Sequence, residues 1–285
     1  MAMTRFLKKV ALLAGGVASA FSIALAGWPA WATERVDVEL VLAVDVSGSV
    51  NHQELRIQRE GYVGAFRSSE VIKAIERGLI QSIAVTYVEW AGTDLNRVVV
   101  PWTKIANKRE AYDFAAALEN APYSNMSSTS IASAIRYSTN EIETNQFEGI
   151  RKVVDISGDG PNNQGGLAPD ARDEALMAGI IINGLPLMTG GKVYVDDNSN
   201  VTLDSYYQAC VIGGPGSFVL PVDHWDGFAE AVRRKIVLEL AHHPVETGLP
   251  LQKVQFLDLN PGIVDCYIGE KIRAGALFNT FEAPR

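Results

Sequence analysis

The sequence lacks an excess of basic residues. Its 285 residues include 25 Lys and Arg against 33 Asp and Glu, a formal net charge of −8. Because residues 1–32 contain three basic residues and no acidic one, the remainder has 22 basic against 33 acidic residues, a net charge of −11. A nucleic-acid-binding domain presents a basic face. The acidic balance therefore argues against nucleic acid as a partner and is compatible with attraction of a cation.

Cysteine and histidine are also scarce. The two cysteines, Cys210 and Cys266, and the four histidines have a spacing that matches no zinc pattern. Both cysteines lie in the part of the chain that we expect to be exported, where an even count permits a disulfide. Two buried free thiols are the alternative. We favour the bridge because it would fix a weakly patterned C-terminal tail.

Long apolar runs are absent after residue 32. Before it, three basic residues precede an apolar stretch from Val10 to about Gly27, and Ala30-Trp31-Ala32 offers a small-x-small cleavage site. This pattern predicts a signal peptide over residues 1–32, cleaved after Ala32. An uncleaved membrane anchor is the alternative, since the run approaches the length of a spanning helix. We therefore expect a secreted or periplasmic protein with no membrane span after cleavage.

What the chain does contain is an alternation of strand and helix patterns. Six apolar segments are expected to be strands: 36–45, 83–89, 96–102, 151–157, 180–185 and 218–222. Amphipathic segments between them predict helices, so we expect a three-layer, Rossmann-like α/β domain with a mostly parallel six-stranded sheet and helices on both faces. Only about seven residues separate the second and third strands, which predicts one antiparallel edge strand.

The regular pattern ends near residue 241. We expect one domain over residues 33–241, followed by a C-terminal extension, residues 242–285, in which the periodicity weakens. A bridge between Cys210 and Cys266 would tether this extension to the domain.

Polar residues gather where two of the expected parallel strands end. The first strand runs into Asp45-Val-Ser47-Gly-Ser49, and the fourth into Gly158-Asp159-Gly160. These ends share one edge of an open α/β sheet, where ligands bind, and Thr129 precedes a helix at the same edge. Taken singly, the first turn and Thr129 are typical of helix caps, and Asp159 of a surface turn. Together they predict an oxygen-ligand site of the kind Mg²⁺ prefers.

This combination resembles the von Willebrand factor type A (vWA) domain and its metal-ion-dependent adhesion site (MIDAS). Asp45-x-Ser47-x-Ser49 matches the first signature of that family. Thr129-Ser-Ile131-Ala-Ser-Ala134-Ile is similar to the second, and Val153-Val-Asp-Ile-Ser-Gly-Asp159-Gly to the third. The order of strands and helices agrees over roughly residues 36–241. Within the family, the chain also resembles exported bacterial proteins of undefined function (DUF1194-like), which share the segment Cys210 to Gly216.

The resemblance implies a metal site made of Asp45, Ser47, Ser49, Thr129 and Asp159. The three hydroxyls would bind the cation directly, and the two carboxylates would act mostly through water and by orienting the hydroxyls. The implied cation is Mg²⁺, with Mn²⁺ or Ca²⁺ as alternatives. The implied partner is a protein that offers an exposed Glu or Asp to the cation, so the implied function is adhesion-type binding without catalysis.

Two departures from the family pattern leave alternatives open. Gly158 stands where the family usually has threonine, and a shifted register would give the role of Asp159 to Asp155. Asp155 lies inside the expected strand, where a buried ion pair or hydrogen bond is the other role for it. The second loop lacks the usual glycines, so Ser127 or Ser128 could replace Thr129.

A second hypothesis is a Mg²⁺-dependent phosphoester hydrolase, because an Asp-led loop after the first strand also occurs in such enzymes. Those with an Asp nucleophile generally need a carboxylate two residues later, and Ser47 cannot act as an acid or base at neutral pH. A Ser nucleophile needs a base, and His52 and His224 belong to no triad motif. A structural exported domain with a non-functional site is the third hypothesis.

Overall fold

The structure, a computed structural model, describes residues 33–48, 50–188, 193–196, 199–241 and 264–281. Its main sheet has the strand order β3-β2-β1-β4-β5. These strands are β1 (Glu34–Asp45), β2 (Ile83–Trp90), β3 (Asn96–Ile105), β4 (Phe147–Gly158) and β5 (Ile180–Pro186). β1 pairs in parallel with β2 and β4, and β4 with β5, whereas β3 runs antiparallel to β2. The expected mostly parallel sheet with an antiparallel edge strand is confirmed.

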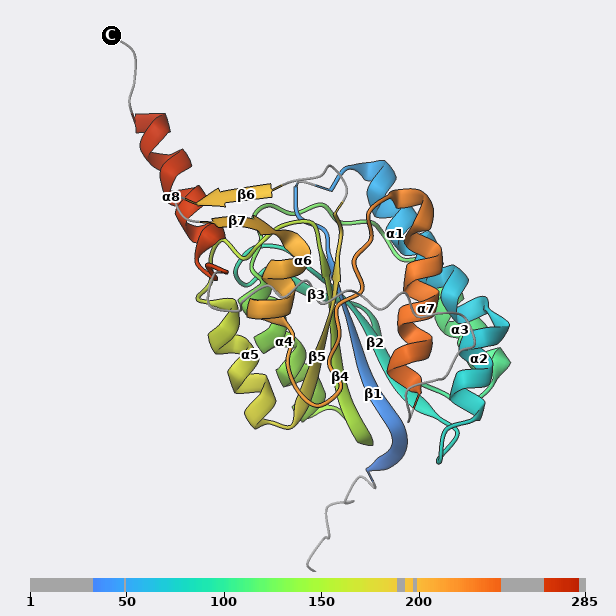
Figure 1. Ribbon diagram of the computed structural model, residues 1–285. Helices are drawn as coiled ribbons and strands as arrows, with labels where there is room; N and C mark the ends of the chain where they lie inside the picture. The colour runs from blue at the N-terminus through green and yellow to red at the C-terminus, as the bar shows by residue number, and fades with distance from the viewer. Residues whose placement is uncertain (1–32, 49, 189–192, 197–198, 242–263, 282–285) are drawn as a thin grey trace, which may run out of the picture. The chain divides into compact units, whose positions relative to one another are not determined.

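Helices cover both faces of this sheet (Figure 1). One face carries α1 (His52–Arg67), α2 (Ser69–Glu76), α3 (Lys108–Glu119) and α7 (Phe228–Leu240). The other face carries α4 (Ile131–Thr144), α5 (Ala168–Met177) and α6 (Leu203–Tyr206), which continues into a π-helical turn, Tyr207–Val211. Alternate residues of β1 belong to the two apolar clusters, Leu40 and Leu42 to one and Val41 and Ala43 to the other. The three-layer architecture is therefore confirmed.

The central position of β1 explains its sequence. Every residue from Val36 to Asp45 is buried, which requires a nearly continuous apolar run. Glu39 is a charged residue within this apolar run. Its buried carboxylate is satisfied by hydrogen bonds from Asn145 Nδ2 (2.7 Å) and the Gly149 N–H (2.7 Å). The strand is thereby held rigidly, with Asp45 at its carboxyl end.

The sixth expected strand needs a correction. Phe218–Val222 lies parallel beside β5 but is joined to it only by isolated bridges. The Leu220 N–H donates to the Gly184 carbonyl (2.9 Å), and the Val222 N–H donates to the Pro186 carbonyl (3.0 Å). A regular ladder would add a bond from the N–H of residue 186 to Leu220, and proline has no N–H to donate. The sheet therefore has five strands rather than six.

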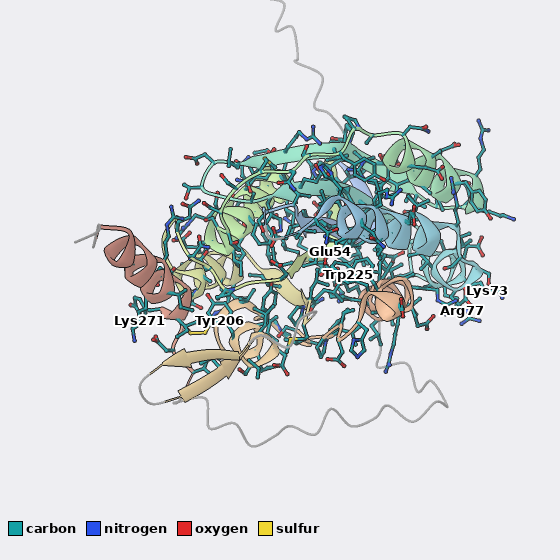
Figure 2. All side chains as sticks on the ribbon, turned by 90° about the horizontal axis from the view of Figure 1, so that it is seen from above. Glu54, Lys73, Arg77, Tyr206, Trp225 and Lys271 are labelled. Atoms are coloured by element: carbon teal, nitrogen blue, oxygen red, sulfur yellow. A yellow bond between two sulfur atoms is a disulfide. The ribbon has the colours of Figure 1, made fainter. Side chains whose placement is uncertain are left out.

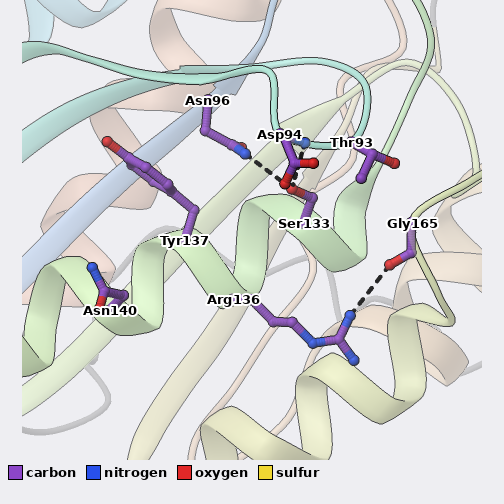
Figure 3. A pocket seen from close by; sticks show the side chains of 8 residues that line it. All are labelled: Thr93, Asp94, Asn96, Ser133, Arg136, Tyr137, Asn140 and Gly165. Atoms are coloured by element: carbon purple, nitrogen blue, oxygen red, sulfur yellow. Dashed lines mark hydrogen bonds between the residues drawn. The ribbon is translucent and has the colours of Figure 1, made fainter.

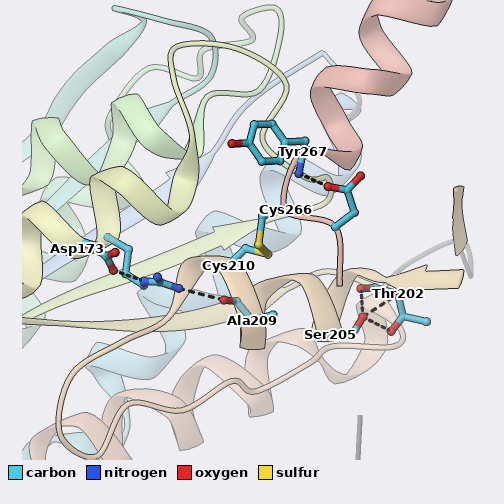
Figure 4. Close-up of a disulfide and its surroundings, with 9 residues drawn as sticks. Asp173, Thr202, Ser205, Ala209, Cys210, Cys266 and Tyr267 are labelled. Carbon is cyan, nitrogen blue, oxygen red and sulfur yellow. Dashed lines mark hydrogen bonds and ion pairs between the residues drawn. A yellow bond between two sulfur atoms is a disulfide. The ribbon is translucent and has the colours of Figure 1, made fainter. Parts of the chain in front are cut away.

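The C-terminal part adds a hairpin and a helix. β6 (Val193–Asp196) pairs antiparallel with β7 (Ser199–Thr202), and α8 (Ile268–Phe281) is the last helix. Cys210, in the π-helical turn, is joined to Cys266 by a disulfide with a Cα–Cα distance of 5.6 Å (Figure 4), which is the alternative that we favoured. The expected signal peptide and residues 242–263 lie outside the described residues. No described helix is long and apolar enough to cross a membrane.

An ionic cluster is buried between α7 and the sheet. Lys235 Nζ lies 2.6 Å from Asp155 Oδ1 and also pairs with Glu239, and each of the three side chains is at most 1% exposed. Asn183 Nδ2 donates to Glu239 Oε1 (3.2 Å). Burial, and then the charge of Glu239, raise the pKa of Asp155 to about 7 although Lys235 opposes the shift. Asp155 thus forms the buried ion pair that the sequence offered as one of its two roles.

We predict that Lys235→Met strongly destabilises the fold. The substitution keeps most of the volume but leaves two buried carboxylates without a cation, which costs about 3–5 kcal/mol. Urea unfolding of the mature chain measures the loss. The control is Arg233→Met on the same helix, whose ion pairs with Glu70 and Glu230 are partly exposed, so its cost should stay within about 1 kcal/mol. Equal losses in the two variants would contradict the prediction.

Candidate metal centre

The first loop of the site begins at Asp45. Its side chain is fully buried at the carboxyl end of β1, and the Ser47 N–H donates to Asp45 Oδ1 (2.7 Å). The cap of α1 is Asn51, whose side chain accepts from the N–H groups of Gln53 (2.9 Å) and Glu54 (3.0 Å). The helix-cap explanation of Asp45 and Ser47 is therefore unnecessary, because Asn51 performs that function. Ser49 lies outside the described residues.

The second loop, residues 120–130, is bonded directly to the first. The Met126 N–H donates to the Val46 carbonyl (3.0 Å). Asn125 Nδ2 donates to the Val50 carbonyl (3.2 Å). These bonds bring the loop that carries Thr129 against the loop that carries Ser47.

Thr129 is one of two buried hydroxyl residues in the second loop, at 7% exposure, and the other is Ser130. Ser130 caps α4, because its Oγ accepts from the Ser133 N–H (3.2 Å), so Thr129 is not needed as the cap. Of the two alternatives to Thr129, Ser127 is exposed and Ser128 is half-buried with a positive φ of 68°. Of the three candidates Ser127, Ser128 and Thr129, Thr129 is therefore the one that the fold buries.

The third loop places Asp159 beside Asp45. Asp159 follows β4 directly, is 9% exposed, and acts electrostatically on Asp45. A Cβ at Gly158 would lie 3.0 Å from Asp45 Oδ2 and 2.8 Å from Tyr207 Oη. The position therefore has no room for the threonine of the vWA pattern. Asp155, the register alternative, pairs with Lys235 in the buried ionic cluster instead, and the role of Asp159 at the site stays a prediction.

The electrostatics of Asp45 are unusual. Burial is the main cause that raises the pKa of Asp45 to about 7, and the charge of Asp159 is the second. Hydrogen bonds from Ser47 and from the Asp159 backbone oppose the rise. Asp45 Oδ2 is buried and has no hydrogen-bond partner among the described residues. A buried, unpartnered carboxylate oxygen is costly. A cation held at this edge would remove that cost.

The residue types fit a hard divalent cation. Among the described residues, no group of three His, Cys, Asp or Glu side chains could hold a metal ion. The site offers two carboxylates, so hydroxyls and water must supply the remaining oxygen ligands, as suits Mg²⁺. Asp45, Ser47, Thr129 and Asp159 are brought to one edge of the sheet, and their role as metal ligands stays a prediction.

Two asparagines support the site, and the sequence analysis missed both. Asn163 Oδ1 accepts from the Thr129 N–H (3.2 Å), and its own N–H donates to the Thr129 carbonyl (3.0 Å). Asn162 is fully buried, and its Oδ1 accepts from the Ala132 N–H (3.0 Å). The third loop thereby holds the second on both sides of Thr129. Asparagines after Gly-Pro are typical of exposed turns, so only their position at a strand end could have indicated this role.

A buried ionic network anchors the start of the second loop. Glu89, at the end of β2, pairs with Arg59 and with Arg97, the latter at 2.7 Å. Both arginines also donate to loop carbonyls, Arg59 to Ala121 and Arg97 to Pro122 (3.3 Å). The loop is therefore bonded to the sheet before it reaches the site.

A further contact at this edge joins α1 to the segment before α7. Seen from above, Glu54 and Trp225 lie beside each other (Figure 2), and Trp225 Nε1 donates to Glu54 Oε1 (3.0 Å). Glu54 Oε2 also accepts from the Asn51 N–H (2.8 Å), which completes the capping box of α1. The two histidines considered for catalysis, His52 and His224, are both exposed.

A separate recess of about 500 Å³ lies beside α4 (Figure 3). It is lined by Thr93, Asp94, Asn96, Ser133, Arg136, Tyr137, Asn140 and Gly165. Asn96 Nδ2 donates to Ser133 Oγ (2.9 Å), and Arg136 Nη1 donates to the Gly165 carbonyl (3.3 Å). Asp94 is the one carboxylate among these lining residues. The recess therefore lacks the pair of acidic side chains that the candidate metal centre has.

Solved structures share this fold at low sequence identity. Proximal thread matrix protein 1 from the mussel byssus has a TM-score of 0.51 at 14% identity, over 72% of this chain and 48% of that chain. The pilus adhesin SpaC from Lactobacillus rhamnosus GG has a TM-score of 0.51 at 13% identity, over 71% of this chain and 30% of that chain. The chain thus spans less than half the length of either protein.

Two more structures are similar over a comparable part of the chain. A von Willebrand factor type A protein from Catenulispora acidiphila has a TM-score of 0.44 at 12% identity, over 71% of this chain and 42% of that chain. A second structure of the mussel protein, described as having a zinc-occupied MIDAS motif, has a TM-score of 0.49 at 13% identity, over 73% and 48%.

A comparison with the curated proteins finds no match. A family model described as "Protein of unknown function (DUF1194)" matches residues 35–244, which is most of the chain and includes all three loops of the site. The sheet order, the layers and the solved neighbours agree with a vWA-like fold. The chain belongs to the DUF1194 family and has a vWA-like, Rossmann-type fold.

Proposed function

We propose that this chain is an exported, cation-dependent protein-binding module. The observation that carries the proposal is Asp45 Oδ2, which is buried without a hydrogen-bond partner among the described residues, near a second carboxylate, Asp159, at the carboxyl edge of the sheet. In this proposal the hydroxyls of Ser47, Ser49 and Thr129 bind Mg²⁺, with Mn²⁺ or Ca²⁺ as alternatives. Asp45 and Asp159 orient those hydroxyls and bound water.

Such a ligand set favours binding of an acidic partner. Hydroxyl and water ligands carry no formal charge, so a divalent cation held mainly by them keeps a strong attraction for an anion. An exposed Glu or Asp of a partner protein can meet that demand. The residues of this chain hold and orient the cation, and no bond of the partner needs to be broken.

Other observations support a binding role and export. Two neighbours of the same fold are described as a byssus matrix protein and a pilus adhesin, which is compatible with adhesion-type binding. The N-terminal pattern of a signal peptide and the disulfide between Cys210 and Cys266 both suit an oxidising compartment outside the cytoplasm.

We predict that Mg²⁺ raises the melting temperature of the mature chain and that Asp45→Asn abolishes the shift. At a free concentration of 100 times Kd, a ligand stabilises the folded state by about 2.7 kcal/mol. In chelator, Asp45→Asn should be at least as stable as the wild type, because the amide removes a buried charge. Differential scanning calorimetry with Mg²⁺ and with EDTA measures both effects.

The matched control is Asp37→Asn, a buried aspartate of the same strand, whose carboxylate accepts from the Ile80 N–H (2.9 Å) and the Ser82 N–H (3.2 Å). Asp37→Asn should be destabilised in both buffers and should retain the full Mg²⁺ shift. An equal shift in the wild type and in Asp45→Asn would overturn the metal site.

We further predict that capture of a partner depends on the cation. Immobilised mature chain should retain a protein from the exported fraction in Mg²⁺ and release it in chelator, and immobilised Asp45→Asn should retain none. Retention that is equal in both conditions would contradict the mechanism even if a metal binds. Turnover of phosphoesters that is lost in Asp45→Asn would instead favour the hydrolase hypothesis.

A further inference from the structure

The start of the C-terminal helix lies against the third loop of the candidate site, although it falls outside the region of the family match, residues 35–244. Cys266, two residues before α8, is bonded to Cys210, and Ile268 is buried in the apolar cluster on the α4 side of the sheet (Figure 4). A Cβ at Gly269 would lie 1.9 Å from the carbonyl oxygen of Asn162. Only glycine permits so close an approach between the helix and the loop.

Two charged side chains of α8 bind three consecutive residues of this loop. Glu270 Oε1 accepts from Asn162 Nδ2 (2.6 Å). Arg273 Nη1 donates to Gln164 Oε1 (2.6 Å) and to Asn163 Oδ1 (3.2 Å). The helix therefore bonds to the same turn that holds Thr129.

Asn163 is the junction between the helix and the site. Its Oδ1 accepts from Arg273 and also from the backbone N–H of Thr129, both at 3.2 Å. A guanidinium group has donors only, so it can bond the oxygen of an amide and not its nitrogen. Arg273 thereby fixes the amide in the orientation that presents Oδ1 to Thr129. A rotated amide would turn its NH₂ group toward the Thr129 N–H, and two donors would face each other.

We propose that α8 is a positioning element of the metal centre, with Arg273 and Glu270 as its positioning residues. The inference rests on the proposed function, because it concerns the affinity of the same cation site. A hydroxyl ligand must be held to within about 0.5 Å of its productive position. The path from Arg273 through Asn163 to the backbone of Thr129 supplies that restraint, and the disulfide keeps the helix beside the loop.

The disulfide and the polar contacts act together. Without the bridge between Cys210 and Cys266, α8 would be linked to the domain only through the 22 residues 242–263. A longer covalent connection lowers the effective concentration of the helix at its docking site. The cation site of the bridged chain is therefore expected to be tighter than that of the chain without the bridge.

The experiment is a calorimetric Mg²⁺ titration of the mature chain and of Arg273→Ala. Because Arg273 is exposed, the melting temperature in EDTA should be unchanged. The Kd of Arg273→Ala for Mg²⁺ should rise about tenfold. This is the lower end of the roughly 10- to 100-fold loss of metal affinity that follows removal of a group that orients a metal ligand. Arg273→Lys keeps a donor for Asn163 Oδ1 and should recover part of the affinity. Lys271→Ala, two residues before Arg273 on the same helix and paired with Asp265 (2.5 Å), should bind Mg²⁺ like the wild type.

A double-mutant cycle tests the path itself. Asn163→Ala should weaken Mg²⁺ binding, and adding Arg273→Ala to it should cause a much smaller further loss than Arg273→Ala causes alone. Fully additive losses would overturn the role of Asn163 as the junction. Cys210→Ser with Cys266→Ser should also raise the Kd. If that variant fails to fold, the surface variant Arg273→Ala still tests whether α8 positions the metal centre.

The outcomes separate the two proposals. A wild type that binds Mg²⁺ and an Arg273→Ala variant with the same Kd would overturn the positioning role and leave the proposed function standing. A wild type that does not bind Mg²⁺, Mn²⁺ or Ca²⁺ would overturn the metal site and the positioning role with it.

Discussion

The edge of the sheet that carries the candidate site is organised by the burial of one carboxylate. Asp45 ends the central strand with its side chain removed from water, one oxygen bonded to the Ser47 N–H and the other without a partner among the described residues. Glycine at position 158 leaves the space that this second oxygen occupies. The second loop, which carries Thr129, and the third loop, which carries Asp159, both lie at this edge of the sheet. A buried carboxylate oxygen that the described residues leave without a partner requires an explanation, and a bound ion is one.

The sequence was sufficient to predict the central strand and the residues at its end, because burial on both faces requires a continuous apolar run. It did not separate a metal loop from a helix cap, since Ser47, Ser49 and Asn51 all come shortly before the expected helix in the sequence. In the structure the cap is Asn51, whose side-chain oxygen accepts from the N–H groups of the second and third helical residues. The predicted number of strands, six, was wrong for a local reason as well. Pro186 has no N–H to continue the hydrogen-bonded ladder between β5 and Phe218–Val222.

The support of the site was harder to predict because it depends on long-range contacts. Asn163 and Arg273 are 110 residues apart, and α8 begins after a stretch without periodicity. Neither residue belongs to a signature of the vWA family. Their roles follow only from the approach of the helix to the loop, which the disulfide and Gly269 permit. Sequence patterns indicate which residues a site contains far better than they indicate what holds those residues in place.

Two buried aspartates of the same domain show what the candidate site lacks. Burial raises the pKa of Asp155 and of Asp45 to about 7, and in each case a second carboxylate adds to the shift. At Asp155 the chain supplies its own cation, with Lys235 Nζ at 2.6 Å. At Asp45, Oδ1 accepts a hydrogen bond from the Ser47 N–H, and Oδ2 has no hydrogen-bond partner among the described residues. A permanent ammonium group there would compete with any other cation. In the proposed site, hydroxyls and water would hold a cation that can exchange, as cation-dependent binding requires.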